Sequence, residues 1–299
     1  MGCNMCPHRC NAVRPLHRMG GAVAGCCASG RTAEIARAGL HFWEEPPVSG
    51  TKGAGTVFFS GCNLHCVYCQ NYDISSEHRG WEVSAEDLKR IYRELAAAGA
   101  HNIDLVTPTH YSDVILESLE ESPGIPVVYN SNGYDAVDTL KKFEGKIQIY
   151  LPDFKYASAE RARKYSGAED YPQKVVEALQ EMFRQVGPWE TDGNGIMKKG
   201  LIIRHLMLPG GLEDTLRVIR TVAEIFKPGD VLFSLMRQYL PCGRVLAGEF
   251  PELNAKVSTR AYDRAVREMF DCGMEDGFTQ GRRSACEEFI PVFDGTGVR

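Results

Sequence analysis

The sequence predicts an α/β protein, with a partial barrel of six parallel strand–helix units that follows a cysteine-rich N-terminal extension. Three observations support this fold class. Short apolar runs alternate with helical patterns after residue 50, and such alternation predicts parallel strands joined by helical crossovers. Residues 1–50 lack this alternation and are rich in Cys, Gly and Arg. The 299 residues, 43% of them hydrophobic, are enough for one large α/β domain.

A loop rich in Pro and Gly divides the chain into two predicted parts. Residues 44–55 read Glu-Glu-Pro-Pro-Val-Ser-Gly-Thr-Lys-Gly-Ala-Gly, and both Pro and Gly interrupt regular structure. We therefore place a boundary near Gly50. Residues 1–50 form the predicted cysteine-rich, metal-binding extension, and residues 51–299 form the predicted partial-barrel domain.

The predicted strands are compact runs of aliphatic and β-branched residues. They cover 56–60, 102–107, 126–130, 147–151, 201–208 and 231–236. The first helix begins at a capping sequence, Ser84 to Asp87, and its apolar residues fall on one face. Further helices are predicted at 135–143 and 212–226, and the stretch 158–186 is predicted to be two helices broken near Gly167 and Pro172.

Composition excludes several classes of protein. The net charge of -5, from 34 basic and 39 acidic residues, does not indicate a nucleic-acid surface. The chain has no apolar run of the roughly 18 residues that a membrane span needs, and its first residues lack the apolar core of a signal peptide. We expect a cytoplasmic protein. Its eleven cysteines stand in metal-ligand spacings, which favours metal binding over disulfides.

The most informative motif lies directly after the first predicted strand. Cys62, Cys66 and Cys69 stand in the run Gly-Cys-Asn-Leu-His-Cys-Val-Tyr-Cys-Gln-Asn. Three thiolates from one loop can hold three irons of a four-iron cluster and leave the fourth iron open. An open metal position is where chemistry takes place. The alternatives are a zinc knuckle that uses Cys66 and Cys69, or thiols that only pack.

Polar residues also follow the later strands, where parallel barrels place their sites. The second strand ends in Thr-Pro-Thr-His-Tyr at 107–111, and the third in Tyr-Asn-Ser-Asn-Gly at 129–133. After the fourth, alternation places Asp153 and Lys155 on one face. In the fifth, Arg204 stands among apolar residues and needs an anionic partner. The alternatives are a helix cap at Thr109 with a solvated histidine after it, an Asn-Gly turn and a surface ion pair.

The cysteine loop resembles that of the radical S-adenosylmethionine superfamily. A closer resemblance is to uncharacterised iron–sulfur proteins related to pyruvate formate-lyase activating enzymes. It rests on Asn71 two residues after the last cysteine, on Asp153-x-Lys155 and on Arg204-His-x-x-x-Pro-Gly, and it covers most of residues 51–240. The resemblance implies a [4Fe-4S] cluster on the three cysteines and S-adenosylmethionine on the open iron. Reductive cleavage then gives a 5'-deoxyadenosyl radical that abstracts hydrogen from substrate.

The resemblance also implies a cofactor pocket. Lys155 and Arg204 are expected at the methionyl carboxylate and Tyr68 near the adenine. The full predicted set is Tyr68, Asn71, Ser131, Asn132, Asp153, Lys155 and Arg204. Two departures weaken parts of this picture. The second strand lacks a Gly-Gly-Glu stretch, so the contact to the cofactor amino group stays open among Thr107, Thr109 and His110. In the activating enzymes an aspartate stands at the position that Asn130 occupies here. The loss of this carboxylate weakens the prediction of a monovalent-cation site near Asp153.

The remaining cysteines form a second group. Cys3, Cys6, Cys10 and Cys26 give four thiolates, which close a structural zinc site or a complete iron–sulfur cluster equally well, and spacing does not choose. In this prediction Cys27 is spare. Near the C-terminus Cys242, Cys272 and Cys286 are expected to pack, with a role as a substrate-radical or hydrogen-donor thiol as the alternative.

The sequence therefore predicts an enzyme of radical S-adenosylmethionine chemistry. Its substrate is a glycyl-radical enzyme, another peptide or a small molecule, and its expected electron donor is a flavodoxin or ferredoxin. No side chain is assigned as a catalytic group. No nucleic acid or membrane partner is expected. The rival hypothesis is a non-catalytic protein in which both cysteine groups bind structural zinc and the barrel binds a ligand or partner.

Overall fold

The computed structural model describes residues 2–18, 25–285 and 290–298. Within these residues ten strands form one sheet, in the order β10-β9-β8-β6-β5-β4-β2-β1-β3, with β7 paired to β8. The strands are β1 (Ala33–His41), β2 (Ala54–Phe59), β3 (Trp81–Val83), β4 (Ile103–Val106), β5 (Val127–Asn130), β6 (Ile149–Tyr150), β7 (Glu190–Thr191), β8 (Met197–Leu206), β9 (Leu232–Met236) and β10 (Gly277–Thr279).

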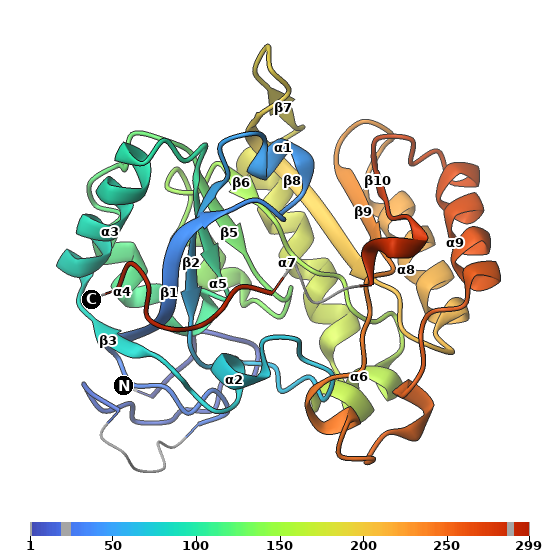
Figure 1. Ribbon diagram of the computed structural model, residues 1–299, viewed down its shortest axis with the longest axis horizontal. Coiled ribbons are helices and arrows are strands. Elements are labelled where there is room, and N and C mark those ends of the chain that lie inside the picture. Colours follow the sequence, from blue (N-terminus) through green and yellow to red (C-terminus); the bar gives the residue numbers. More distant parts are fainter. Residues whose placement is uncertain (1, 19–24, 286–289, 299) are drawn as a thin grey trace.

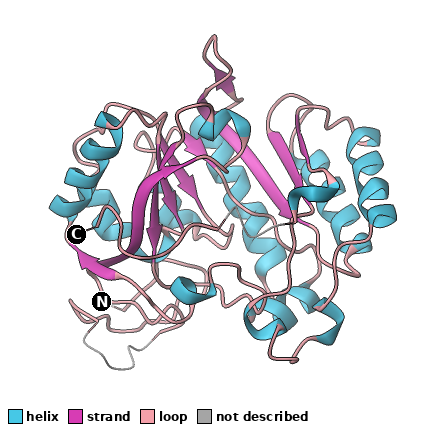
Figure 2. Ribbon diagram, viewed as in Figure 1, coloured by secondary structure: helices cyan, strands magenta, loops and turns pink. Residues whose placement is uncertain are grey.

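Helices lie outside the sheet, with α3 and α4 on one side of the molecule and α8 and α9 on the other (Figures 1 and 2). They are α1 (Pro46–Ser49), α2 (Tyr72–Ser75), α3 (Ala85–Ala97), α4 (Ser112–Ser118), α5 (Val137–Lys141), α6 (Ala159–Ser166), α7 (Tyr171–Val186), α8 (Leu212–Ile225) and α9 (Thr259–Asp271). Among the described residues no helix is both long and apolar enough to cross a membrane.

The sheet confirms the expected alternation and is larger than predicted. All six predicted strands form, and they pair in parallel from β2 through β4, β5, β6 and β8 to β9. A further parallel strand, β10, joins β9, and β1 pairs antiparallel with β2. The structure is thus an α/β fold with a mostly parallel central sheet. Its closure as a six-unit barrel stays a prediction.

The helix boundaries follow the local signals in the sequence. Ser84 and Asp87 form the predicted capping box at the start of α3, whose buried residues include Leu88, Ile91 and Leu95. The predicted break in 158–186 also forms. Helix α6 ends at Gly167, whose φ of 67° is in the left-handed region, and α7 begins with Pro172 in its first turn.

Both ends of the described chain pack against the sheet. Strand β1 belongs to residues 1–50, so the sheet continues across the predicted boundary near Gly50. Near the other end, Ala38 donates its backbone N–H to Thr296, and Gly295 donates to Ala36. The C-terminal segment therefore runs along β1 and across the front of the sheet in Figure 1.

Candidate functional site

The cysteine loop leaves the carboxyl end of β2 and turns into a cavity. Cys62 and Cys66 are each 9% exposed, and all three cysteines line one cavity of about 460 Å³. Ligand pockets fall in the range of about 300 to 1,000 Å³. The predicted trio of thiols is therefore assembled at a cavity wide enough for a cofactor.

Each thiol of the loop accepts a hydrogen bond from a neighbouring side chain. Asn132 Nδ2 lies 3.4 Å from Cys62 Sγ, Ser166 Oγ lies 3.0 Å from Cys66 Sγ, and Ser75 Oγ lies 3.2 Å from Cys69 Sγ. Donors to sulfur stabilise a thiolate and help to set the potential of a bound cluster. These three contacts come from different segments of the chain, so the fold supports the loop from several sides.

Burial and the neighbouring thiols make deprotonation of the loop cysteines unfavourable without a bound cation. Burial, followed by the neighbouring Cys66, raises the pKa of Cys62 and of Cys69, while Ser75 and Lys155 act in the opposite direction at Cys69. Because a thiolate is the form that binds metal, the buried loop needs a cationic centre to hold its thiols deprotonated. An iron–sulfur cluster meets this need, and the donor set fits it.

The arrangement of the thiols bears on which metal centre they hold. Among the described residues no three Cys, His, Asp or Glu side chains are arranged to hold a single metal ion. A zinc ion requires its ligands to converge on one point. In a four-iron cluster each thiolate binds a different iron, so the sulfur atoms stand farther apart. The two kinds of centre therefore require different distances between the three sulfur atoms.

The predicted cofactor pocket is brought together around the same cavity. All seven predicted residues line it, together with Thr107. They are Tyr68, Asn71, Ser131, Asn132, Asp153, Lys155 and Arg204. The sequence thus identified a set of residues that the fold places on one surface.

Three charged residues form a chain along the cavity wall. Lys155 Nζ lies 2.7 Å from Asp153 Oδ2, and Arg204 Nε lies 3.0 Å from Asp153 Oδ1. Burial favours the neutral acid, but Arg204 and Lys155 outweigh it and lower the pKa of Asp153. The thiols of Cys66 and Cys69 are among the charges that raise the pKa of Lys155. Lys155 therefore stands between the cysteine loop and the rest of the charged chain.

Arg204 has two anionic partners, as expected for a cation among apolar residues. They are Asp153 and Glu44. Besides Asp153, its Nη1 lies 3.1 Å from Glu44 Oε2 and its Nη2 lies 2.6 Å from Asn130 Oδ1. A guanidinium carries five N–H donors. Three are engaged by these partners, and two remain for a ligand.

Two acidic residues of this site were missed by the sequence analysis. Glu44 and Glu45 lie in the segment that was interpreted only as a loop, yet both line the cavity. The signal was present as an adjacent pair of carboxylates before a Pro-Pro sequence. Local pattern could not show that the pairing of β1 with β2 returns this segment to Arg204.

Residues at the end of the second predicted strand take structural roles. Thr109 Oγ1 donates to Asp135 Oδ1 at 2.6 Å, and Ser131 Oγ donates to Asp135 Oδ2 at 2.6 Å. The solvated alternative for His110 is wrong, because this residue is 2% exposed and its Nε2 lies 2.8 Å from Ser60 O. Neither Thr109 nor His110 lines the cavity, whereas Thr107 does. Thr107 is thus the better placed of the three candidates for the cofactor amino group.

The N-terminal thiols gather beside the cysteine loop. Burial is the largest cause that raises the pKa of Cys3, Cys6 and Cys26, and Cys27 adds to it in each case. The residue predicted to be spare is therefore a neighbour of the others. His8 Nε2 lies 2.8 Å from Asn63 O, which joins this segment to the loop of Cys62.

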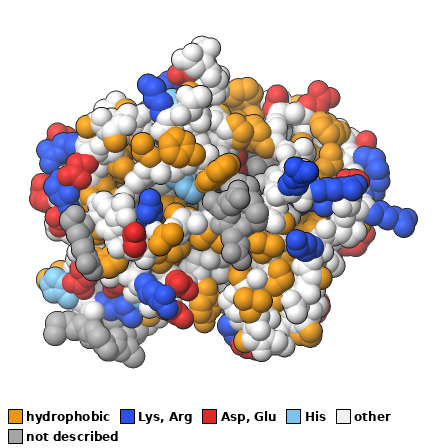
Figure 3. Space-filling view, viewed as in Figure 1, with side chains coloured by type: hydrophobic (Ala, Val, Ile, Leu, Met, Phe, Trp, Pro, Cys, Tyr) orange, Lys and Arg blue, Asp and Glu red, His pale blue; other side chains and the backbone are white. Residues whose placement is uncertain are grey.

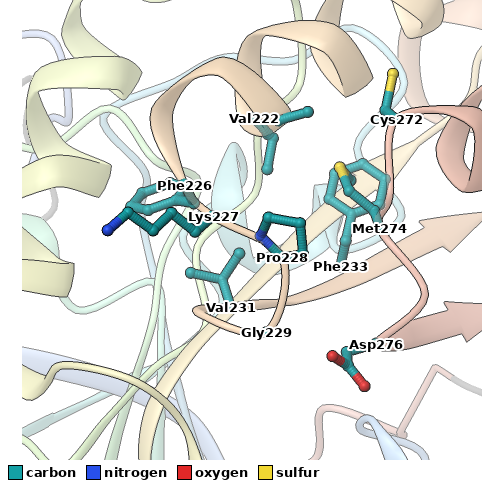
Figure 4. Close-up of a pocket in the computed structure, with 11 residues that line it drawn as sticks. Val222, Phe226, Lys227, Pro228, Gly229, Val231, Phe233, Cys272, Met274 and Asp276 are labelled. Atoms are coloured by element: carbon teal, nitrogen blue, oxygen red, sulfur yellow. The ribbon is translucent and has the colours of Figure 1, made fainter.

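Two of the remaining cysteines, Cys242 and Cys272, lie outside the main cavity. Cys272 lines a small hollow between α8 and α9 with Val222, Phe233 and Met274 (Figure 4). Its volume of about 20 Å³ holds no more than a water molecule, which fits the predicted packing role. Cys242 donates to Tyr68 O at 3.0 Å. Cys286 lies outside the described residues.

Comparison with known proteins gives matches at the level of sequence. The model of the radical SAM superfamily matches residues 56–193. The uncharacterized protein MJ0674 of Methanocaldococcus jannaschii is 27% identical over 274 residues, which are 88% of this chain and 73% of that protein. A 7-carboxy-7-deazaguanine synthase of Methanothermobacter thermautotrophicus is 38% identical over 69 residues, 22% of this chain and 28% of the synthase.

Solved structures with a similar fold include SuiB of Streptococcus suis. The structure bound to S-adenosylmethionine has a TM-score of 0.51 at 13% identity and covers 75% of this chain and 49% of SuiB. The structure bound to the precursor peptide SuiA has a TM-score of 0.51 at 14% identity. This match covers 75% of the present chain and 47% of SuiB. The chain spans about half the length of SuiB. The match to the radical SAM superfamily thus covers residues 56–193, which include the cysteine loop, and the fold is similar to that of SuiB.

Proposed function

We propose that this protein is a radical S-adenosylmethionine enzyme that abstracts a hydrogen atom from its substrate. The single observation that carries the proposal is that Cys62, Cys66 and Cys69 share one cavity with the polar residues predicted for the cofactor. The superfamily implies a [4Fe-4S] cluster and S-adenosylmethionine. When bound, the cluster supplies the electron that cleaves the sulfonium and produces the 5'-deoxyadenosyl radical.

The side chains of the cavity take distinct parts in this proposal. Lys155 and the two unengaged N–H groups of Arg204 bind the methionyl carboxylate, and Asp153 holds both cations in place. Tyr68 is fixed by a 2.6 Å hydrogen bond between its hydroxyl and that of Tyr156. Tyr156 in turn lies 2.8 Å from Ser166, the donor to Cys66. This hydrogen-bonded chain ties the orientation of the proposed adenine neighbour to the cysteine loop.

The substrate class is proposed at a coarser level. We infer a peptide or protein substrate, with a relation to pyruvate formate-lyase activating enzymes as the finer form of the proposal. The similar fold of SuiB, which has been solved with a precursor peptide, supports this direction. A small-molecule substrate is the alternative. The electron donor that the proposal requires is a flavodoxin or ferredoxin.

A second metal centre at the N-terminal thiols is also proposed. Cys3, Cys6, Cys10 and Cys26 are the candidate ligands, and Cys27 is a neighbour whose charge raises the pKa of Cys3 and of Cys26 after the larger effect of burial. Zinc and a second iron–sulfur cluster are the alternatives for this centre. The candidate monovalent-cation site stays a prediction, and the oxygens of Asn130 and Asp153 that would serve it already accept hydrogen bonds from Arg204.

Oxygen-free reconstitution with iron and sulfide tests the enzyme proposal. The protein should turn brown, bleach with dithionite, and release 5'-deoxyadenosine from S-adenosylmethionine. Cys66→Ala should reduce this product to background, because one iron loses its ligand. Cys272→Ala is the matched control, since that thiol lines only the small hollow. Undiminished product in Cys66→Ala, or zinc without iron in the reconstituted protein, would overturn the proposal in favour of the structural zinc protein.

A further inference from the structure

Four carboxyl groups gather around Arg204 in one part of the cavity. Asp153, Glu44 and Glu45 line the cavity, and Asp104 is a fourth carboxyl group with no exposed surface. Arg204 is the largest opposing charge on Glu45, and it also interacts with Asp153, Glu44 and Asp104. One guanidinium is therefore shared among four carboxyl groups.

Glu45 has a buried acceptor without a hydrogen-bond partner beside this cavity, among the described residues. Its side chain is 8% exposed and lines the cavity, and Ser234 donates a hydrogen bond to its carboxylate. The atom Oε2 is buried and has no hydrogen-bond partner among the described residues, and the same holds for Asp104 Oδ1. A buried acceptor without a donor is unfavourable, because it has lost its hydrogen bonds to water. A ligand that brings a donor and a positive charge would recover this free energy.

The surroundings of Glu45 suit a cationic group on an apolar stem. Trp43, Pro46 and Phe278 line the same cavity, and Trp43 is 56% exposed. Apolar side chains also gather across the middle of the face shown in Figure 3, which the loop between β1 and α1 crosses in Figure 1. Long amines and guanidines place their methylene groups on such surfaces and keep the charged end at a polar partner.

We propose that Glu45, together with Glu44, forms a subsite for a protonated amine or guanidinium group of the substrate. This inference rests on the proposed function and adds the chemical class that the enzyme recognises. It points to a substrate with a primary amine or guanidine at the end of an alkyl chain, as in a lysine or arginine side chain.

The cysteine loop and the segment of Glu44 and Glu45 leave opposite ends of β2. The loop follows the end of β2, whereas Glu44 and Glu45 follow His41, which pairs with Ala54 at the start of β2. A sulfonium whose methionyl group chelates the cluster must lie near the cysteines. The side chain of Glu44 reaches Arg204 at 3.1 Å, so the proposed subsite adjoins the contact proposed for the methionyl carboxylate. The thiols of Cys66 and Cys69 are among the charges that act on Lys155, whereas Arg204 and Glu44 are the largest charges that act on Glu45.

The test compares simple probes that do not depend on the rest of the substrate. Binding of n-pentylamine, n-pentylguanidine and neutral pentan-1-ol to the reconstituted protein with S-adenosylmethionine is measured by calorimetry without oxygen. At least one cationic probe should bind about tenfold more tightly than pentan-1-ol, the effect of a charge-assisted hydrogen bond. In Glu45→Gln this preference should fall to near unity, and in the exposed control Glu86→Gln it should persist.

A second measurement on the unaltered chain keeps the test independent of the variant. Burial and the neighbouring Glu44 raise the pKa of Glu45 to about 7 against the opposing charge of Arg204. Asp104, whose pKa is also raised by burial, faces the same group. Binding of the cationic probes should therefore strengthen between pH 6 and pH 8, and binding of pentan-1-ol should not.

Several outcomes would overturn the inference. The first two are equal affinity for charged and neutral probes, and no binding of either kind of probe. The third is displacement of the amine by stoichiometric Na⁺ or K⁺. The fourth is a loss of S-adenosylmethionine binding in Glu45→Gln that is as large as the loss of amine binding. Formation of 5'-deoxyadenosine is recorded in the same preparations. If it occurs without a preference for cations, only the subsite is refuted. If it does not occur, the proposed function fails.

Discussion

The two groups of cysteines differ in their number of thiols and in their access to a ligand. The loop of Cys62, Cys66 and Cys69 offers three thiols to a cavity of about 460 Å³, and each thiol accepts a hydrogen bond from another segment. The N-terminal group offers up to five thiols, and none of them lines that cavity. Three ligands beside open space suit chemistry, whereas four or more away from it suit a structural centre.

Loss of one ligand at each site should give the largest contrast. Cys66→Ala should abolish cleavage of S-adenosylmethionine, because its iron loses a ligand at the reactive cluster. Cys6→Ala should lower the melting temperature and the metal content but keep cleavage, because Cys6 lies outside the cavity. Metal analysis and 5'-deoxyadenosine assays on both variants check this. Equal loss of cleavage in both would remove the distinction between the sites.

Acid should destabilise the scaffold that holds Asp153 and Lys155 through the buried ring of His205. Burial lowers the pKa of His205 from 6.5 to about 4, and this ring contacts Phe154 O at 2.6 Å between Asp153 and Lys155. Between these pH values the unfolded chain binds a proton that the folded chain does not. Stability is therefore lost as pH falls from 6.5, by up to about 3 kcal/mol for this residue.

Denaturant unfolding of metal-free protein at pH 7.5 and pH 4.5 measures this loss. In His205→Gln the difference between the two pH values should shrink by most of that amount, since the titrating ring is gone. Cys6→Ala should keep the full difference. A pH dependence in His205→Gln equal to that of the unaltered protein would show that the buried ring does not titrate as described.

Removal of Lys155 should weaken the cofactor site by a smaller amount. Lys155→Met keeps much of the side-chain volume but removes the cation beside the cysteine loop, so the Kd for S-adenosylmethionine should rise about tenfold. Lys164→Met, which removes a half-exposed lysine paired with Glu252, is the matched control. Calorimetry on the two reconstituted variants measures the Kd for S-adenosylmethionine in each. A Kd changed equally by both variants would contradict the role of Lys155.

The smallest effect concerns the scaffold rather than either cysteine site. Ser84→Ala removes the hydrogen bond from Asp87 N to Ser84 Oγ at the start of α3. Stability should fall by about 1 kcal/mol, as for other N-caps. Cleavage and metal content should both stay at the level of the unaltered protein when assayed well below the melting temperature. A change in either would mean that the two sites depend on the scaffold more than their contacts indicate.

Local patterns in the sequence predicted the parts of the fold that depend on local physics. Apolar runs identified the six parallel strands, the capping sequence at Ser84 identified α3, and Gly167 with Pro172 marked the break between α6 and α7. The residues expected around the cofactor also line one cavity, because the carboxyl ends of adjacent parallel strands meet at one edge of the sheet.

Contacts between distant segments could not be predicted in the same way. Pairing of β1 with β2 depends on a partner strand that periodicity does not reveal, and it moves Glu44 and Glu45 from an apparent linker into the cavity. The burial of His110 likewise depends on Ser60 O, fifty residues earlier. In both cases the decisive interaction is long-range, so the residue type gave only an ambiguous signal.

Electron paramagnetic resonance of the reduced, reconstituted Cys6→Ala protein tests the central claim most directly. If Cys62, Cys66 and Cys69 hold a cluster with one open iron, the spectrum should show a reduced [4Fe-4S] centre whose signal changes when S-adenosylmethionine is added. A protein with no such signal, or with a signal that the cofactor leaves unchanged, would contradict the claim.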